Sequence, residues 1–305
     1  MTGGPRGVRA WVPWAFLAPN LAIITLFALL PVLINVMYSV TGSDRLYPSE
    51  RPFVGLENFA TLLECDNYLD PASCSRDLFW RAVANAIVFV PSQVVVMIAV
   101  ALATAIALNR DIRARGFFRG VFFFPVMLSP VVVAMTWLWI LQKDGALNGL
   151  LLTLGFERTT WLADPSRAFL WSIFVTVWAH VGFYTIILLA GLQGIPADVY
   201  EAARMDRTPP WRVFTRITLP LLKPVLLVVF ILAVIRAVQT FDEIYVLTGG
   251  GPGTATKMIV HYIFDTGFAV MPRNYGLAAA ASLMLGAVLF VFTAIQMRIS
   301  RGTDG

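Results

Sequence analysis

Three polar side chains interrupt a long apolar stretch and are the first candidates for chemistry in this sequence. Arg236, Thr240 and Glu243 recur at helical spacing, so they would share one face of a helix, and Gln239 flanks that face. An ionisable group within an apolar helix is costly and usually faces the interior of a helix bundle. The stripe predicts a binding site whose polar side chains hydrogen-bond a hydroxyl-rich ligand. The alternative is that a nearby carboxylate neutralises Arg236, which then only holds helices together.

Aromatic side chains in a second apolar stretch could complete such a site. Trp178 and Tyr184 offer flat apolar surfaces that suit the ring faces of sugars, and both carry a polar edge. His180 lies between them, and the only other histidine is His261. His180 is therefore better explained as a hydrogen-bonded core residue than as a metal ligand, and we expect ligand contacts from Trp178 and Tyr184.

The motifs of nucleotide hydrolysis and metal catalysis are missing from the sequence. No GxxxxGK[ST] phosphate loop occurs, and the glycine-rich stretch GGGPGTAT at 249–256 lacks the Lys-Ser/Thr pair, so it predicts a turn-rich loop. No HExxH or paired-carboxylate spacing points to a metal. We therefore predict no catalytic residues, no metal site and no cofactor bound by this chain.

The elements that would position these residues are membrane-spanning helices. The chain is 58% hydrophobic and 13% charged, with a mean hydropathy of +0.74, whereas a soluble domain carries about 25% charged residues. Runs of about 20 apolar residues span a bilayer as helices, because their backbone must be hydrogen-bonded within the segment. Six runs meet this description: 14–40, 82–108, 120–141, 168–192, 224–248 and 274–297. The sequence predicts an all-α polytopic membrane protein with six transmembrane helices.

The distribution of basic residues predicts which side of the membrane each segment faces. Thirteen of the 23 Lys and Arg residues lie in the termini and in the segments around 109–119 and 193–223, whereas the opposite loops hold nine and most of the acids. Positive charge marks the cytoplasmic side, so we expect a cytoplasmic N-terminus at 1–13 and a cytoplasmic tail at 299–305. The first run is too long for a signal peptide and predicts an uncleaved anchor. The net charge of +5 then reflects topology, and no nucleic-acid partner is needed.

Both cysteines, Cys65 and Cys74, fall in the first loop on the outer side. Outside the cytoplasm a disulfide can form, and Pro71 between them indicates a turn. A pair of free thiols is the alternative, and the sequence leaves both open.

The charged segment 196–220 stands between two apolar runs. Pro196 suits the first turn of a short helix that continues to Met205, and Thr208 could cap a second helix with Pro209 at its first position. The sequence predicts two short helices that meet at a bend. On periodicity alone, the second would be an amphipathic helix whose arginines contact anionic lipid.

The order of residues in this segment gives a more specific indication than its periodicity. EAA at 201–203 and ITLP at 217–220 stand at the spacing of the cytoplasmic EAA loop in permease subunits of binding-protein-dependent ABC importers. The sequence resembles the carbohydrate branch of that family, the maltose and glycerol-3-phosphate permeases, along nearly its whole length. The other matching stretches are FVGLENF at 53–59, ARGFFRGVFFFP at 114–125, LAGLQGIP at 189–196 and FDEIYVLTGGGPGTAT at 241–256.

The resemblance implies a type I importer permease fold and a coupling helix within 196–220 that sits in a cleft of a cytoplasmic ATPase subunit. In the family a glycine stands where this chain has Arg207, and glycine takes a positive φ more readily than arginine. We expect either a different turn at Arg207, helped by Thr208 and Pro209, or an altered bend. ATPase-coupling roles are implied for Glu201, Ala202, Ala203, Asp206, Arg207, Arg212 and Arg216.

The implied function is that of one permease subunit, without a catalytic site of its own, in the bacterial cytoplasmic membrane. It would move a sugar or sugar-like solute, and Arg236 would also suit glycerol phosphate or a derivative. The implied partners are the lipid bilayer, a second permease subunit, two ATPase subunits that hold ATP and Mg, and an extracytoplasmic solute-binding protein docked on outer loops 41–81 and 249–273. An ion-coupled secondary transporter is the main alternative, but it leaves the EAA loop unexplained. A membrane enzyme would need reactive residues that the sequence lacks.

Overall fold

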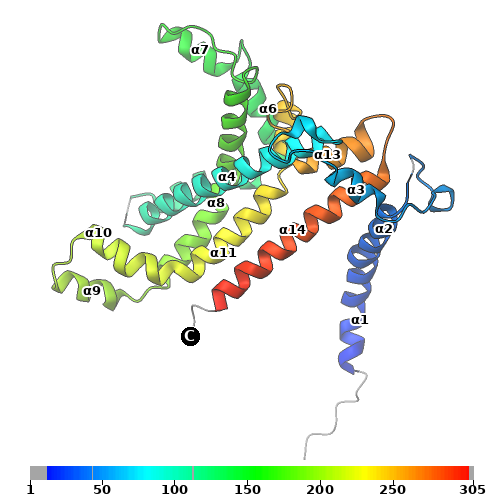
Figure 1. The fold of residues 1–305 in the computed structure, drawn as a ribbon. Coiled ribbons are helices and arrows are strands. Elements are labelled where there is room, and N and C mark those ends of the chain that lie inside the picture. The colour runs from blue at the N-terminus through cyan, green and yellow to red at the C-terminus, as the bar shows by residue number, and fades with distance from the viewer. Residues whose placement is uncertain (1–11, 43, 112, 302–305) are drawn as a thin grey trace, which may run out of the picture. The chain divides into compact units, whose positions relative to one another are not determined.

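The computed structural model describes residues 12–42, 44–111 and 113–301, and in this part of the chain the fold is built from helices (Figure 1). Arg6 and Arg9, and most of the predicted terminal segments 1–13 and 299–305, lie outside the described residues. The described residues fall into two compact units, one within Met1–Glu64 and Ile263–Gly286, the other within Cys65–Tyr262 and Ala287–Gly305. The predicted all-α class is confirmed.

Five single helices are long and apolar enough to cross a membrane, within the described ranges. They are Trp14–Ser39, Asp77–Asn109, Pro165–Gln193, Pro210–Val238 and Tyr275–Arg298. A sixth span is available if the bent pair Arg115–Met127 and Pro130–Thr153 counts as one. Each of these segments overlaps one of the six apolar runs of the sequence.

The first unit combines the N-terminal helices with the start of the last one. Its elements are α1 (Val12–Ile24), η1 (Thr25–Leu29), α2 (Leu30–Ser39), η2 (Pro48–Glu50), α3 (Glu57–Leu63), η6 (Asp265–Ala269) and the first part of α14 (Tyr275–Arg301). Within this unit the Asn35 amide donates to Ser282 Oγ at 2.8 Å, which links α2 to α14.

A buried arginine organises the loop that follows α2. The Arg51 side chain donates from Nε to Thr41 Oγ1 at 2.9 Å, and its guanidinium lies 4.5 Å from the centre of the Tyr38 ring. Burial lowers the pKa of Arg51 from its ordinary value, yet a guanidinium stays charged at any physiological pH. The Asn58 amide adds a bond to the Ser39 carbonyl at 2.8 Å. These contacts hold the loop against the helix ends.

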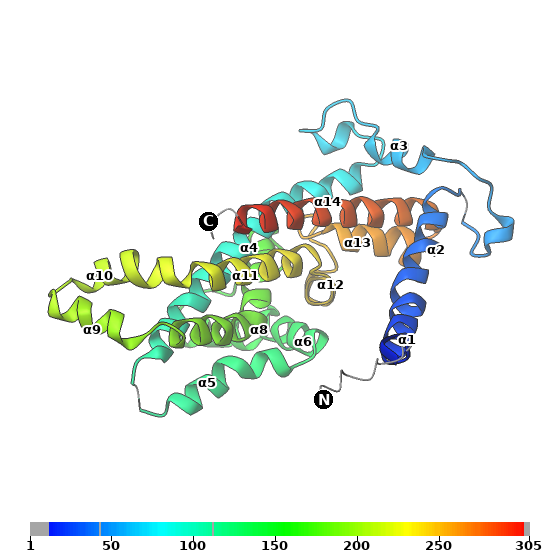
Figure 2. The same cartoon turned by 90° about the horizontal axis from the view of Figure 1, so that it is seen from below.

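The second unit is a bundle around α4 (Asp77–Asn109), α8 (Pro165–Gln193) and α11 (Leu219–Val238), which pack against one another (Figure 2). Phe89, Leu188, Leu222 and Val229 are fully buried between them. The remaining elements are η3 (Pro71–Ser73), α5 (Arg115–Phe123), η4 (Phe124–Met127), α6 (Pro130–Leu141), α7 (Ala146–Thr153), α9 (Ala197–Met205), α10 (Pro210–Val213), η5 (Phe214–Thr218), α12 (Asp242–Thr248) and α13 (Ile259–Phe264), which runs on into the first unit.

The third predicted run, 120–141, is wrong as a single straight helix. The chain bends by 100° between η4 and α6. Leu128 and Ser129 are extended, with ψ of 147° and 137°. Pro130 explains this, because the ring of a proline disfavours the helical conformation in the residue before it.

The fifth predicted run, 224–248, is also wrong as one helix. The helix begins earlier, at Pro210, and ends at Val238. Phe241, with φ −139° and ψ −63°, separates it from α12. The break lies between Arg236 and Glu243, so two helices rather than one form the polar stripe.

Candidate functional site

The charged segment forms a helical hairpin that projects beyond the ends of α8 and α11 (Figure 1, Figure 2). Its expected caps are shifted: Pro196 is the residue before α9 rather than part of its first turn, and Pro209 precedes α10, which starts at Pro210. The residue before α10 is Pro209, so Thr208 is not its N-cap. The second helix is not short either, because α10, η5 and α11 run on without a break from Pro210 to Val238. One arm of the hairpin is therefore a rigid extension of α11.

The bend of the hairpin is a Schellman motif with arginine at its left-handed position. Arg207 has φ +51°, its N–H donates to the Arg204 carbonyl at 3.0 Å, and the Thr208 N–H donates to the Ala203 carbonyl at 3.0 Å. The different turn predicted for Arg207 is wrong, because Arg207 adopts a left-handed conformation that glycine takes readily, and an altered bend stays a prediction. The cost of a left-handed arginine is about 1 kcal/mol, which the two bonds and the packing of α9 offset.

The side chains of α9 divide into a packed face and an open face. Ala203 is buried, whereas Glu201 and Ala202 are exposed. The Tyr200 hydroxyl lies 3.2 Å from Thr218 Oγ1 and links α9 to the opposite arm. The predicted alanine pair is thus split, with one alanine packing the hairpin and the other available for close contact with a partner.

The other residues proposed for this surface are open to solvent. Asp206, Arg207, Arg212 and Arg216 are all exposed. The Arg212 guanidinium lies 5.3 Å from the centre of the exposed Trp211 ring. The hairpin therefore combines charge with apolar surface on side chains that nothing in the second unit covers.

The polar stripe is assembled across the break between α11 and α12. Arg236 Nη2 lies 3.0 Å from Glu243 Oε1 and 2.8 Å from His180 Nε2 on α8. Arg236 can only donate, so His180 accepts at Nε2 and donates from Nδ1 to the Thr176 carbonyl at 2.9 Å. This assigns the neutral tautomer to His180. With one cation and one anion, the cluster has no net charge.

Burial in this cluster is uneven. The Glu243 side chain is 2% exposed, whereas the Arg236 side chain is 37% exposed. Glu243 therefore does not share a helix face with Arg236, as the spacing predicted, but holds it from a separate helix. Thr240 is buried, and its hydroxyl donates to the Arg236 carbonyl at 3.0 Å; Gln239 is exposed. Arg236 and Gln239 are the members of the stripe that a solute could reach.

The two predicted aromatic companions lie in different surroundings. Tyr184 is 3% exposed and belongs to the core of α4, α8 and α11. Trp178 stacks edge-on against Trp137, with ring centres 5.5 Å apart, and borders a cavity of about 450 Å³ lined mainly by aliphatic and phenyl groups. Neither ring makes a hydrogen bond or ring contact to Arg236 in the described structure.

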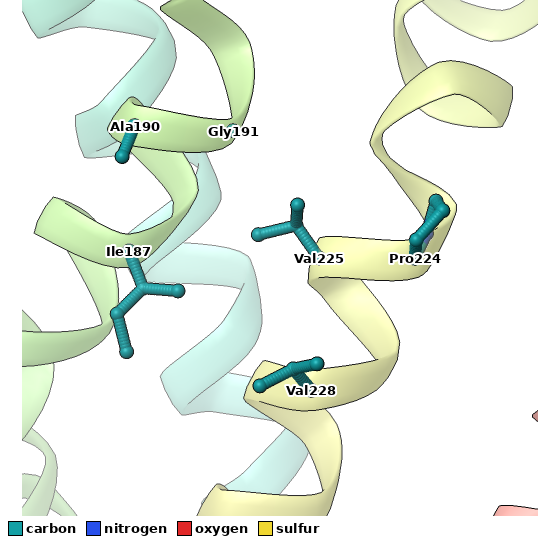
Figure 3. A pocket seen from close by; sticks show the side chains of 6 residues that line it. All are labelled: Ile187, Ala190, Gly191, Pro224, Val225 and Val228. Atoms are coloured by element: carbon teal, nitrogen blue, oxygen red, sulfur yellow. The ribbon is translucent and has the colours of Figure 1, made fainter. Parts of the chain in front are cut away.

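A shallow, open groove lies between α8 and α11 (Figure 3). Val225 and Val228 extend from α11 toward α8, where Gly191 leaves room (Figure 3). Its lining is entirely apolar, so it offers no hydrogen bond to a sugar hydroxyl. A side chain at Gly191 would meet Val225 and Leu222, so this glycine is needed for the close approach of the helices.

Two further links join separate segments of the second unit. With its amide oriented for hydrogen bonding, the Gln193 oxygen accepts from Arg115 at 2.7 Å and from Arg119 at 2.9 Å. This contact and the Tyr200–Thr218 contact were missed in the sequence, because no periodic pattern relates separate helices. The structure also joins Cys65 and Cys74 in a disulfide, with Cα atoms 3.9 Å apart.

Comparison with known proteins finds similar chains over nearly the full length. Residues 97–305 match a family described as "Binding-protein-dependent transport system inner membrane component". The chain is 34% identical over 294 residues to the trehalose/maltose transport system permease protein MalF of Thermococcus litoralis, covering 96% of this chain and 95% of the relative. It is 34% identical over 294 residues to the lactose transport system permease protein LacF of Rhizobium radiobacter, covering 94% and 93%. A crystal structure of a bacterial alginate ABC transporter in complex with an alginate pentasaccharide-bound periplasmic protein shares the fold, with a TM-score of 0.80, 23% identity and coverage of 97% and 96%.

Proposed function

We propose that this chain, which belongs to the family of binding-protein-dependent transport system inner membrane components, carries a sugar through the membrane at the expense of ATP hydrolysed by a partner. As a sugar-type ABC importer permease it is a multi-pass protein of the cytoplasmic membrane, with the type I permease fold of six transmembrane helices. This membership removes the support for an ion-coupled secondary transporter. ATP and Mg would be held by the partner ATPase and not by this chain.

The hairpin of α9 and α10 is the observation that supports energy coupling. Its open face presents Glu201 and Ala202, and one of its arms is continuous with α11 up to Val238. This face lies on α9, which the Arg207 turn and the Tyr200–Thr218 contact join to the continuous arm, so a partner that moved this face would displace the helix that carries Arg236. We assign the ATPase contact to this face, with Asp206, Arg207, Arg212 and Arg216 at its edge.

Replacing Glu201 tests the assignment. Glu201→Lys inverts the charge on an exposed position, so the complex should still fold while sugar uptake falls by about 100-fold, the loss of a contact worth about 2.7 kcal/mol. Asp198→Lys makes the same charge change one turn earlier in α9, on another exposed side chain, and should leave more than half of the uptake. Uptake and ATPase activity are measured together in proteoliposomes. Equal uptake by the two variants would exclude the assigned contact.

The charge balance of the polar cluster supports a neutral sugar as the solute. The Arg236 charge is already matched by Glu243 at 3.0 Å, so an anionic solute would have to compete with a buried carboxylate. The two permease relatives named above are described for trehalose, maltose and lactose, which carry no charge, whereas the alginate transporter is 23% identical and shares the fold. Glycerol phosphate, expected as one option from the sequence, has no support from these relatives. We therefore assign a neutral di- or oligosaccharide to the site at Arg236 and Gln239.

A double substitution tests this charge balance. Glu243→Gln leaves the Arg236 charge uncompensated and should lower the free energy of unfolding by about 1 kcal/mol, because the Arg236 side chain is 37% exposed and water screens its charge. Adding Arg236→Met should restore most of that loss and keep transport of a neutral disaccharide measurable. Preferred transport of a uronic acid disaccharide by the unchanged protein would contradict the assignment of a neutral solute.

The remaining partners follow from the family. The family description names a binding protein, and we infer that it docks on loops 41–81 and 249–273 outside the cell. The disulfide between Cys65 and Cys74 in the first of these loops supports an oxidising exterior there, and with it a cytoplasmic location of both termini. A second permease subunit and two ATPase subunits would complete the assembly.

A further inference from the structure

We propose that the hairpin of residues 145–156, which contains α7, is an anchor that lies in the lipid at the membrane–water boundary. The hairpin follows α6 and precedes α8, so it lies at the end of α8 opposite the EAA hairpin. Nothing in the transport function described above requires it. Its composition, its exposed side chains and its hydrogen bonds each indicate lipid as the surrounding medium.

Composition is the first indication. The twelve residues GALNGLLLTLGF carry no charged side chain and include five leucines and one phenylalanine. The segment Pro130–Thr153, which includes α7, meets the length and hydropathy conditions of a membrane span together with the helix before it. The charged residues lie where the hairpin begins and ends, and Arg158 pairs there with Asp144 at 2.7 Å.

The exposed side chains are the second indication. Leu150, Leu152, Leu154 and Phe156 are between 46% and 63% exposed, and only Asn148 among the helix residues is fully buried. A surface that docks a protein usually has an apolar centre and a polar rim. Exposed charged side chains are confined to the base of the hairpin and none lies along residues 145–156, which fits a segment that enters lipid from a polar boundary.

The hydrogen bonds are the third indication, because lipid offers no partner to a polar group. The Asn148 amide donates to the Lys143 and Thr159 carbonyls at 3.0 and 2.8 Å and accepts from the Thr159 N–H at 3.0 Å. The Thr153 hydroxyl donates to the Leu150 carbonyl at 2.7 Å. The polar side chains of the hairpin are thus satisfied within the protein.

The end of the helix meets the same requirement. The Gly155 N–H donates to the Leu152 carbonyl at 3.1 Å, and the Phe156 N–H donates to the Leu151 carbonyl at 2.9 Å. Trp139, near the end of α6 from which the hairpin emerges, is 62% exposed. Tryptophan is enriched at the boundary between lipid and water, so this residue indicates the depth at which the hairpin starts.

The test uses Leu152→Cys, labelled with an environment-sensitive fluorophore in the intact complex. The chain has only two cysteines and the structure joins them in a disulfide, so without reductant the new thiol is the only free thiol of this chain. The complex with unchanged Leu152 gives the background labelling of the other subunits. The complex is placed in nanodiscs of phosphatidylcholine and phosphatidylglycerol, with or without nitroxide groups on the acyl chains. We expect the nitroxide lipids to lower the fluorescence about two-fold or more. Lys143→Cys, an exposed position where the hairpin begins, is the matched control and should be quenched less.

Two outcomes would overturn the proposal. A water-like emission at position 152 that nitroxide lipids do not change would mean that the hairpin stands in solvent. A shielded emission that nitroxide lipids do not quench, and that disappears when the binding protein or the second permease is omitted, would mean that it docks on protein. Thr153→Cys repeats the measurement with a smaller change of side chain if Leu152→Cys does not assemble. None of these readings depends on transport, so they stand apart from the proposed function.

Discussion

The hairpins at the two ends of α8 end their short helices with the same hydrogen-bonded turn, but with different residues at its left-handed position. In α7 the turn uses Gly155, with φ +82°, and in α9 it uses Arg207, with φ +51°. Each turn makes the same pair of backbone bonds. The local backbone is therefore not what distinguishes the two hairpins.

The side chains are what distinguish them. The α7 hairpin has no charge in twelve residues, whereas the α9 hairpin exposes both acids and arginines. A shared turn thus supports an element suited to lipid in one case and an element suited to a protein partner in the other. The comparison teaches that the cost of a poor turn residue, about 1 kcal/mol, is small beside the cost of a charge in the wrong medium.

Placing a charge on the apolar hairpin should have the largest effect. Leu152→Asp puts a carboxylate on an open side chain of α7, and we expect the free energy of unfolding of the complex in lipid to fall by about 2 kcal/mol. Met205→Asp makes a comparable change on α9, where Met205 is 87% exposed, and should change it by no more than about 0.5 kcal/mol. Denaturation in bicelles measures both. Similar losses at the two positions would mean that the hairpins share one medium.

The next effect concerns the left-handed glycine. Gly155→Ala should cost about 1 kcal/mol, because a Cβ there meets no atom within 4 Å and only the backbone conformation resists it. Gly149→Ala, in the middle of the same helix and equally free of contacts, should instead stabilise α7 by about 0.5 to 1 kcal/mol. Hydrogen exchange of the hairpin amides reports both changes. A loss of hairpin stability in both variants would indicate that atoms outside the described residues crowd the two glycines.

The contrast also shows what the sequence can and cannot predict. Apolar runs predicted the type and position of the spans, because burial in lipid demands long apolar helices. The described residues form five such helices, or six if the bent pair counts as one span. Pro130 and the residues before Asp242 break two of those helices, and hydropathy alone does not register such breaks. The structure brings Arg236 and Glu243 together, as the sequence grouped them, but the assumed continuous helix wrongly placed them on one face.

Contacts between helices that are distant in the sequence could not be predicted from the sequence. The bond from Arg236 to His180 joins residues 56 positions apart, and no spacing rule relates α8 to α11. The conformation of Arg207 was missed for another reason. Residue preference disfavours a positive φ for arginine, but the two hydrogen bonds of the turn outweigh that preference.

Replacing Arg207 by glycine gives the turn of α9 the same left-handed residue as the turn of α7. Arg207→Gly removes the backbone strain, but the added freedom of glycine in the unfolded chain offsets part of this stabilisation. We expect a net stabilisation of α9 by about 0.5 to 1 kcal/mol. Slower exchange of the Thr208 N–H, which bonds to the Ala203 carbonyl, measures this gain. Arg207→Ala keeps the strain and should show no slowing. If both variants slow exchange equally, the arginine side chain and not its backbone is the source of the cost.

The smallest effect should come from the one side-chain bond that joins the arms of the α9 hairpin. Tyr200→Phe and Thr218→Val each remove one partner of the 3.2 Å contact, and the double variant completes a mutant cycle. We expect a coupling of about 0.5 kcal/mol, typical of a hydrogen bond between neutral groups near solvent. The α7 hairpin has its counterpart in Asn148, which is fully buried, so Asn148→Ala should cost several times more because it leaves the Thr159 N–H without its partner. A coupling near zero at Tyr200 and Thr218 would mean that the α9 hairpin is held by packing at Ala203 alone.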